Sequence, residues 1–579
     1  MTRLRWLLPW AIFVALGASA PEPSTWIRDH AIPLKTVEPA HGFDDLQPLA
    51  PLVGDARIVA LGEATHGTRE FFQLKHRLIE FLASQKGFTI FSIEANMPEA
   101  YRLNDFVLNG NGDPKKLLKG LYFWTWDTEE VLGMILWMRE FNRSGKGRIE
   151  FTGFDMQTPN MAMDLVRHFV KEHDAPYFDT LNRAYTDVEN VQKAVPPKPT
   201  FGAANAIFPV KLAAGHRIKY SGYIRTQDVT QGSASLWWRV DGASKMLSLD
   251  TMPDHGAKGT TPWTLYEMSI DVPAEATKIA FGVQHPGNGT AWFDSLRVDI
   301  DGVSYTDSSD FDLDFESATP RGFETGGEGH VLSLDNTVAH TGKQSLRSIT
   351  QNDPNVLDPR QVAEESKRVL EHLDNQRAIL LHDSSPKDVD WTIQNARLVQ
   401  QFMLLKTEEQ SRDKSMAQNV EWIADHNPGA KIILWAHNGH VEYKNPPGFD
   451  PMGRYLHERF GHELVNFGFS FNEGSFRAIE TGKGLHEFTV GPLGEGSFDG
   501  MLASARVPLF ALDLRHVPEV GPVAQWFAAP HDMRSIGAQY GGGQPESWSI
   551  GSQSWPGVFD VILFVEKTTA SRGNPKLNQ

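Results

Sequence analysis

Histidines and carboxylates stand directly after several short apolar runs of this sequence. One run leads into Glu63 and His66, others end at Glu94 and Asp155, and another leads to the pair 382–383. A further run leads into the segment 437–440, which reads His-Asn-Gly-His. Burying such groups without partners costs several kcal/mol, so they either satisfy one another or line a solvated pocket. Their number makes helix capping alone an insufficient explanation.

An imidazole held by a carboxylate is suited to hydrolysis by an activated water. His66 is the candidate general base, because imidazole titrates near neutrality and a carboxylate fixes its tautomer and raises its basicity. Glu63 or Glu94 could be that carboxylate. A second imidazole, His437 or His440, would protonate the leaving alkoxide or stabilise the oxyanion.

Further residues complete the candidate site. Arg412 would neutralise the charge that develops in the tetrahedral intermediate. Aromatic side chains near residue 125 could line an apolar pocket, although such clusters more often belong to a core. We assign substrate contacts to His440, Glu70, Trp124, Trp126 and Asp155.

The same histidines and carboxylates could serve two other functions, metal-dependent hydrolysis and ligand binding without catalysis. Two histidines and two glutamates could fill a metal coordination sphere of nitrogen and oxygen only, because the chain has no cysteine. We assign no metal ligand and no cofactor, and keep a metal-dependent hydrolase and a non-catalytic protein that binds a metal complex or haem as alternatives. The sequence has no Gly-x-Ser-x-Gly elbow, Walker loop, dinucleotide fingerprint or His-Glu-x-x-His helix.

Hydrophobic periodicity indicates the elements that carry these residues. Between Trp26 and Val195, and again from about Pro359, short apolar runs alternate with helical spacing such as Phe71, Leu74, Leu78 and Leu82. This predicts an α/β fold with a mostly parallel sheet flanked by helices, in which the carboxyl ends of the strands form the ligand-binding rim. The expected strands are 57–61, 88–93, 149–153, 378–381, 432–436, 464–469 and 558–565.

Residues 199–352 have a different sequence pattern, in which polar and apolar residues alternate and turn-forming residues recur in place of helical spacing. They predict an inserted all-β jelly-roll sandwich, which divides the α/β domain into segments 21–198 and 353–579. The run 289–298 is typical of the last strands of a carbohydrate-binding module, and 314–346 is typical of its first strands. The insert is therefore either circularly permuted or two incomplete modules, and we expect one or two of Trp237, Trp238, Trp263 and Trp292 to stack on carbohydrate.

The remaining features concern location and partners. Residues 1–20 combine arginines, an apolar stretch and small residues, which predicts a signal peptide and an exported, periplasmic or secreted protein. A formal charge of −17 without a dense basic run argues against nucleic acid as a partner, because no cluster of lysines or arginines could bind a phosphate backbone. No later apolar run is long enough to span a membrane, so no transmembrane span is expected in the mature chain.

Longer motifs carry a family resemblance. The run 60–67 (ALGEATHG), the run 91–96 (FSIEAN), Asp155, the segment 412–419 and the run 435–440 (WAHNGH) resemble the erythromycin esterase family. The resemblance implies cleavage of an ester or lactone by water, without a covalent intermediate, with His66 as base and with Glu63, Glu94, Arg412, His437 and His440 in the cleft. The β insertion departs from the family pattern, so the expected partner is a small-molecule or glycosylated ester, and neither macrolide cleavage nor antibiotic resistance follows.

Overall fold

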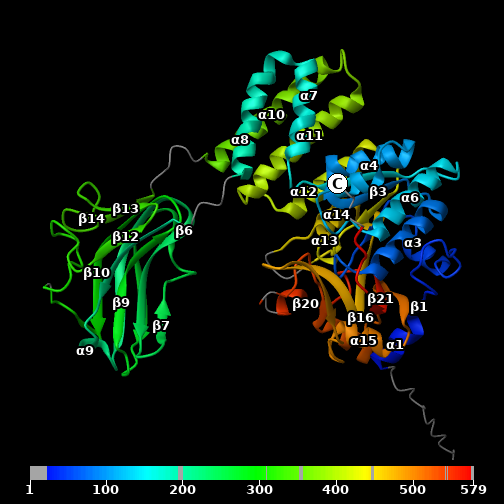
Figure 1. Cartoon of the computed structure of the whole chain (residues 1–579). Coiled ribbons are helices and arrows are strands. Elements are labelled where there is room, and N and C mark those ends of the chain that lie inside the picture. The colour runs from blue at the N-terminus through cyan, green and yellow to red at the C-terminus, as the bar shows by residue number, and fades with distance from the viewer. Residues whose placement is uncertain are drawn as a thin grey trace, which may run out of the picture. The chain divides into compact units, whose positions relative to one another are not determined.

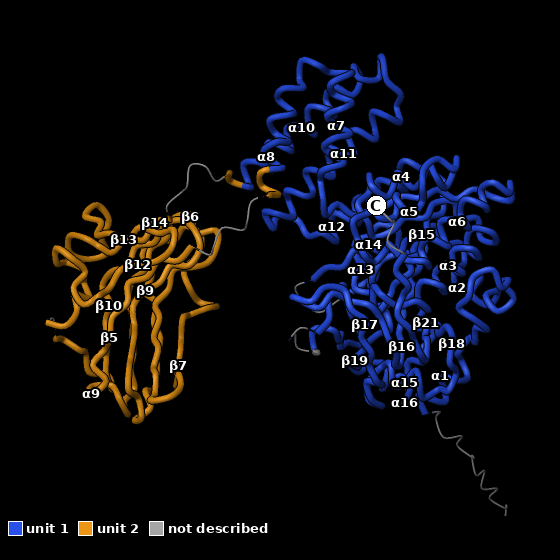
Figure 2. Tube along the Cα trace, viewed as in Figure 1, with its two compact units in different colours: residues 1–189, 359–579 blue, residues 190–358 orange. Residues whose placement is uncertain are grey.

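The computed structural model of the chain describes residues 22–193, 200–307, 309–350, 357–444, 449–541, 543 and 546–574. These residues form two compact units, shown in different colours in Figure 2: Met1–Glu189 together with Pro359–Gln579, and Asn190–Asp358. The predicted insert, 199–352, falls inside the second unit. The predicted signal peptide, residues 1–20, lies outside the described residues.

The first unit is built on a nine-stranded sheet with the order β1-β18-β21-β16-β2-β15-β3-β4, and β17 pairs with β16. The pairings from β21 through β16, β2, β15 and β3 to β4 are parallel, whereas those of β1, β18 and β17 are antiparallel. The strands are β1 (Ile32–Pro33), β2 (Ile58–Leu61), β3 (Ile90–Asn96), β4 (Glu150–Asp155), β15 (Ile432–Trp435), β16 (Leu464–Glu480), β17 (Gly484–Val490), β18 (Leu509–Asp513) and β21 (Val561–Thr568).

Two predictions about strands need correction. The pairings of the second unit are all antiparallel among the described residues, so the sheets of the chain taken together are mostly antiparallel, and the parallel arrangement holds only for the centre of this one sheet. The expected strand 378–381 is instead the end of helix α10 (Pro359–Leu380). A four-residue apolar run does not distinguish a strand from the last turn of a buried helix.

Helices cover the sheet, and Figure 1 shows α7, α8, α10 and α11 as a group that extends beyond it. Helix α11 packs against both α7 and α10. In the described part of the chain, no helix has the length and apolar character needed to cross a bilayer. The principal helices are α3 (Arg69–Gln85), α4 (Met97–Asn109), α6 (Glu129–Arg143), α7 (Asn160–His173), α8 (Phe178–Lys193), α11 (Pro386–Lys406), α12 (Arg412–His426), α13 (Asn438–Val441), α14 (Met452–Phe460) and α15 (Phe498–Ser504).

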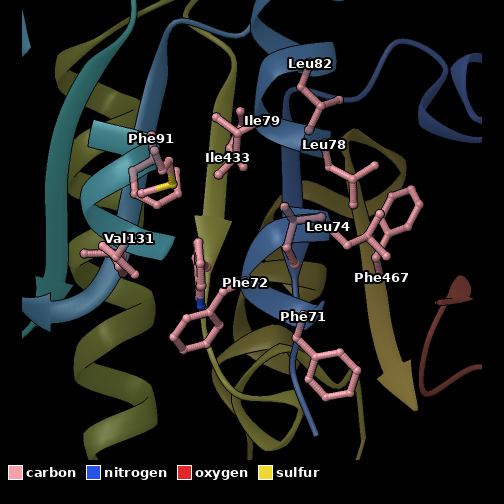
Figure 3. Close-up of a cluster of buried hydrophobic side chains, with 14 of the residues drawn as sticks. Phe71, Phe72, Leu74, Leu78, Ile79, Leu82, Phe91, Val131, Ile433 and Phe467 are labelled. Atoms are coloured by element: carbon pink, nitrogen blue, oxygen red, sulfur yellow. The ribbon is translucent and has the colours of Figure 1, made fainter. Parts of the chain in front are cut away.

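The core of this unit lies where α3 packs on the sheet. Figure 3 shows its apolar face, including Phe72, Leu74 and Leu78, against Ile433 of β15 and Phe467 of β16. The predicted helical spacing of residues 71–82 is thus confirmed. Because β2 and β15 lie beneath this helix, the loop that joins β2 to α3 is held at the carboxyl edge of the sheet.

The second unit is all β apart from the short helix α9 (Val210–Ala213), and it has its own core. The 25-residue strand β6 (Arg217–Asp241) pairs with β8 and β10 along its first half and with β7 and β9 along its second half. Tyr220 of the first half contacts Trp238 of the second half and Phe281 of β9 in the core. The other strands are β5 (Phe201–Ile207), β7 (Met246–Asp250), β8 (Ala257–Asp271), β9 (Lys278–Pro286), β10 (Thr290–Ile300), β11 (Val303–Ser304), β12 (Glu324–Glu328), β13 (His330–Asp335) and β14 (Ser345–Thr350).

Candidate active site

Four adjacent parallel strands bring the predicted residues to one edge of the sheet. His66 lies in the loop after β2, His437 is the second residue after β15, Glu94 lies in β3 and Asp155 ends β4. Parallel neighbours end at the same edge, so residues far apart in the sequence meet there. The rim expected from the polar strand ends therefore exists for these four strands.

Two glycines let the loop after β2 fit closely against its neighbours. A Cβ atom at Gly62 would lie 2.2 Å from Oδ1 of Asn438, and one at Gly67 would lie 2.1 Å from the carbonyl oxygen of Arg477. The loop is also tied by backbone hydrogen bonds, since the Asn438 amide donates to the Glu63 carbonyl over 2.9 Å. The loop that carries His66 is therefore held firmly against the segment that carries His437.

His66 has one ring nitrogen bound and one available. Its Nδ1 lies 2.8 Å from Oε1 of Glu63, and among the described residues its Nε2 has no hydrogen-bond partner. The side chain keeps 12% of its surface exposed, whereas that of Glu63 is fully buried. A carboxylate on Nδ1 requires that nitrogen to carry the proton, which leaves the lone pair on Nε2 for a substrate or a water.

Glu63 pairs with a buried lysine. Nζ of Lys75, on α3, donates to Oε2 of Glu63 over 2.7 Å, and the Trp435 indole donates to the same oxygen over 2.8 Å. Burial lowers the pKa of Lys75 to about 8 against the opposing effect of the Glu63 charge. Glu63 is thus an ion-paired carboxylate that orients the imidazole of His66.

Arg412 joins two of the predicted carboxylates. It donates to Asp155 from Nε (3.1 Å) and Nη2 (2.7 Å), and Nη2 also lies 2.7 Å from Oε1 of Glu94. Burial by itself lowers the pKa of Arg412, but the two carboxylates outweigh it and raise the pKa. The fork geometry fixes the guanidinium plane, and Asp155 acts here as its anchor.

His440 lies between two carboxylates. Its Nδ1 is 2.8 Å from Oδ1 of Asp413, and its Nε2 is 3.3 Å from Oε1 of Glu94. Burial opposes its charge, but these two neighbours raise the pKa of His440 to about 10. The ring is thus protonated, and its 3.1 Å approach to Nη1 of Arg412 is a contact between two donors and not a hydrogen bond. Burial likewise raises the pKa of Glu94, but the charges of His440 and Arg412 reverse this and hold it well below its ordinary value.

His437 is fixed as a neutral ring. Its Nδ1 accepts from the Gly439 amide over 3.1 Å, so Nε2 must be the protonated nitrogen that donates to the Ile536 carbonyl over 3.1 Å. Burial and the nearby imidazoles of His66 and His440 lower the pKa of His437 to about 3. Its centroid lies 5.0 Å from that of His66, so it forms a wall of the site next to the available nitrogen.

Three predicted substrate contacts have other partners. Trp126 is buried, its indole N–H donates to the Glu94 carbonyl over 3.1 Å, and its ring makes an edge-to-face contact with the ring of His66. It is therefore mainly a core residue. Both carboxylate oxygens of Glu70 accept hydrogen bonds from Thr569 at 2.6 Å. Trp124 is half-buried, with the guanidinium of Arg477 5.9 Å from the centre of its ring.

Sequence reasoning missed two site residues and included one segment wrongly. Lys75 occupies the apolar face of α3 between Phe71 and Leu78, and a lysine at such a position is the signal that could have revealed it. Asp413 stands next to Arg412 at the start of α12. The pair 382–383, expected after a strand, follows helix α10, and Asp383 lies 3.3 Å from His173.

Two further observations bear on ligands. Among the described residues, no group of three or more histidines, aspartates or glutamates has a geometry that could hold a metal ion. A cavity of ≈ 510 Å³ lies beside β17, with Val490, Arg534 and Tyr540 in its lining, and none of the described residues that line it belongs to the predicted site.

The sequence is similar to a known protein family and to several known proteins. The family model for erythromycin esterase matches residues 83–206 and 333–568. Erythromycin esterase type II of Escherichia coli is 32% identical over 174 residues, which cover 29% of this chain and 40% of that protein. A putative hydrolase of Bacillus subtilis, YbfO, is 30% identical over 185 residues, or 31% of this chain and 40% of that protein. The alignments thus span about two-fifths of each relative's length.

Two solved structures share the fold. A crystal structure of a Bacillus cereus protein superimposes with a TM-score of 0.59 at 20% identity, covering 95% of this chain and 98% of that chain. A structure named a succinoglycan biosynthesis protein gives a TM-score of 0.58 at 20% identity, with the same coverage. Since the family model matches more than half of the sequence, the chain belongs to the erythromycin esterase family.

Proposed function

We propose that this chain hydrolyses a carboxylic ester or lactone by means of a water activated at His66, without a covalent intermediate. The observation that carries the proposal is the Lys75–Glu63–His66 chain, with contacts of 2.7 and 2.8 Å, in which Nε2 of His66 has no hydrogen-bond partner among the described residues. Such an arrangement prepares an imidazole to accept a proton from water. Family membership supports hydrolysis as the reaction class.

Arg412 and His440 supply the positive charge for this reaction. Both are held by carboxylates in a buried cluster, where their charge acts with little screening by water. A preorganised cation of this kind stabilises an oxyanion that forms during attack on the carbonyl. Under this proposal Asp155 and Asp413 act by positioning these two cations.

The direct test is a hydrolysis assay of purified protein on macrolides, aryl esters and acylated sugars, with and without chelator, beside a His66→Ala variant. Turnover that His66→Ala loses and chelation spares supports the proposal and names the substrate class. Turnover that chelator abolishes favours the metal-dependent alternative. Ligand binding by both proteins without any turnover favours the non-catalytic alternative, for which the ligand classes are a metal complex or haem.

We propose a second role for the inserted unit, as a jelly-roll module that binds carbohydrate. Supporting it is an aromatic group outside the core of this unit, where Tyr223 stacks on His340 at 3.6 Å and Trp263 meets the same ring at 5.7 Å. Of the four predicted tryptophans, Trp238 and Trp292 are buried, whereas Trp263 and Trp237 are half-exposed.

Affinity electrophoresis on a panel of polysaccharides tests this second role. Retardation that Trp263→Ala reduces supports the proposal, with Trp548→Ala as the matched control because Trp548 is an exposed tryptophan of the other unit. Retardation that both variants share equally would contradict a site at Trp263. We further propose that the chain is exported, which fractionation of expressing cells tests.

A further inference from the structure

Ester cleavage needs a proton for the leaving alcohol, and the two imidazoles after β15 are not arranged to give it. His437 donates its only N–H to the Ile536 carbonyl. His440 directs both of its N–H groups to the carboxylates of Asp413 and Glu94. The donor is then either His66 itself, once it has taken a proton from water, or another acidic group near it.

A buried carboxyl stands next to these histidines. Glu442 follows α13, the short helix that carries His440, and is only 5% exposed. Its Oε2 accepts from the Gln553 amide over 2.9 Å, and among the described residues its Oε1 has no hydrogen-bond partner. A Cβ atom at Gly439 would lie 3.4 Å from Nδ1 of His437 and 3.8 Å from Oε1 of Glu442, so these two atoms flank the same glycine.

Burial favours the neutral form of Glu442. Of the charged groups of the site, His440 and Asp413 act on it with opposite signs. Burial raises the pKa of Glu442 to about 7, with the Gln553 hydrogen bond and the His440 charge opposing it and the Asp413 charge adding to it. Glu442 is therefore partly protonated at neutral pH.

We propose that Glu442 is the general acid of the ester hydrolysis and donates a proton from Oε1 to the oxygen of the leaving alcohol. The inference rests on the function proposed above. His66 takes one proton from water as the new C–O bond forms, the ester C–O bond then breaks, and the Glu442 proton passes to the departing alkoxide. The proton on His66 returns to Glu442 through solvent, so the net reaction is ester plus water to acid plus alcohol.

A leaving-group comparison tests the proposal. Two esters of one acid are compared, an aryl ester whose phenolate leaves without help and an alkyl ester whose alkoxide needs a proton. Glu442→Gln keeps the shape and neutrality of the side chain but removes the acid. We expect kcat for the alkyl ester to fall by about 10²-fold or more while the aryl ester is cleaved at close to the wild-type rate.

Glu99 offers a matched control. It is also buried, burial raises its pKa to about 7, and its Oε2 has no hydrogen-bond partner among the described residues. The charged groups that act on it are Arg102 and Asp155, whereas those that act on Glu442 are His440 and Asp413. Glu99→Gln should therefore leave the ratio of alkyl to aryl rates unchanged.

Equal losses for the two esters in Glu442→Gln, or no loss for either, would overturn the assignment. Wild-type protein that cleaves neither ester would instead count against the proposed function itself. If Glu442→Gln does not fold, Glu442→Asp takes its place, because the shorter carboxyl should also lower the alkyl rate more than the aryl rate. Equal losses for the two esters in Glu442→Asp contradict the assignment.

Discussion

Lys75 forms the buried ion pair of Glu63. Its side chain is fully buried and reaches Glu63 over 2.7 Å, with the Trp435 ring centre 4.5 Å from its ammonium group. Removing one member of a buried ion pair leaves the other charge uncompensated. The orientation of the His66 imidazole is thus supported by a lysine on the apolar face of a helix.

Lys75→Met should therefore lower the free energy of unfolding by about 3–5 kcal/mol, since it leaves Glu63 buried without its ion-pair partner. The double variant Lys75→Met with Glu63→Gln should regain part of that stability, because neither charge is then buried. Chemical denaturation of the three proteins measures both effects. A double variant no more stable than Lys75→Met would show that the loss comes from packing and not from charge.

His440 should make stability depend on pH in a definite direction. Its pKa is raised from 6.5 to about 10 by Asp413 and Glu94, which outweigh burial. A raised pKa contributes stability that is complete below pH 6.5 and is lost as the pH rises through 10. His440→Gln should therefore cost most below pH 6.5 and progressively less toward pH 10. A pH-independent difference in the denaturation midpoint would contradict a protonated His440.

At the scale of elements, strand ends were predictable and single helix positions were not. Polar residues after apolar runs identified the ends of β2, β3, β4 and β15, because parallel strands expose their carboxyl ends together. The run 378–381 was wrong because four apolar residues also fit the last turn of α10. The links from Lys75 to Glu63 and from Asp413 to His440 depend on tertiary packing, which no periodicity shows.

The loop between β2 and α3 should tolerate no side chain at Gly67. An added Cβ would lie 2.1 Å from the carbonyl oxygen and 2.6 Å from the amide nitrogen of Arg477, which are backbone atoms with little freedom to move. Gly67→Ala should therefore destabilise the protein by about 1–3 kcal/mol or more. Thermal denaturation measures the loss, together with the rate of ester hydrolysis.

Gly133 provides the control for this substitution. It lies inside α6, and a Cβ there would have no atom within 4 Å. Gly133→Ala should raise stability by about 0.5–1 kcal/mol, because glycine is a poor residue for a helix interior. If Gly67→Ala and Gly133→Ala changed the stability of the protein equally, that result would contradict the close approach of the Arg477 backbone to Gly67.

At the scale of the whole molecule, the two units have separate hydrophobic cores. One contains the α3–sheet interface around Phe72 and Ile433, and the other contains Tyr220, Trp238 and Phe281. Calorimetry of the full chain should therefore show two transitions, and Lys75→Met should lower only one of them. A single transition that shifts as a whole would contradict the independence of the cores.

The central claim is that His66 activates water, and the most direct measurement of it is chemical rescue. We expect His66→Ala to lower kcat/KM for an aryl ester by about 10²–10⁴-fold, the usual contribution of a general base. Imidazole added to the assay should restore part of the rate, because it can occupy the space that the side chain leaves beside Glu63. A His66→Ala variant that hydrolyses the ester at the wild-type rate would contradict the account.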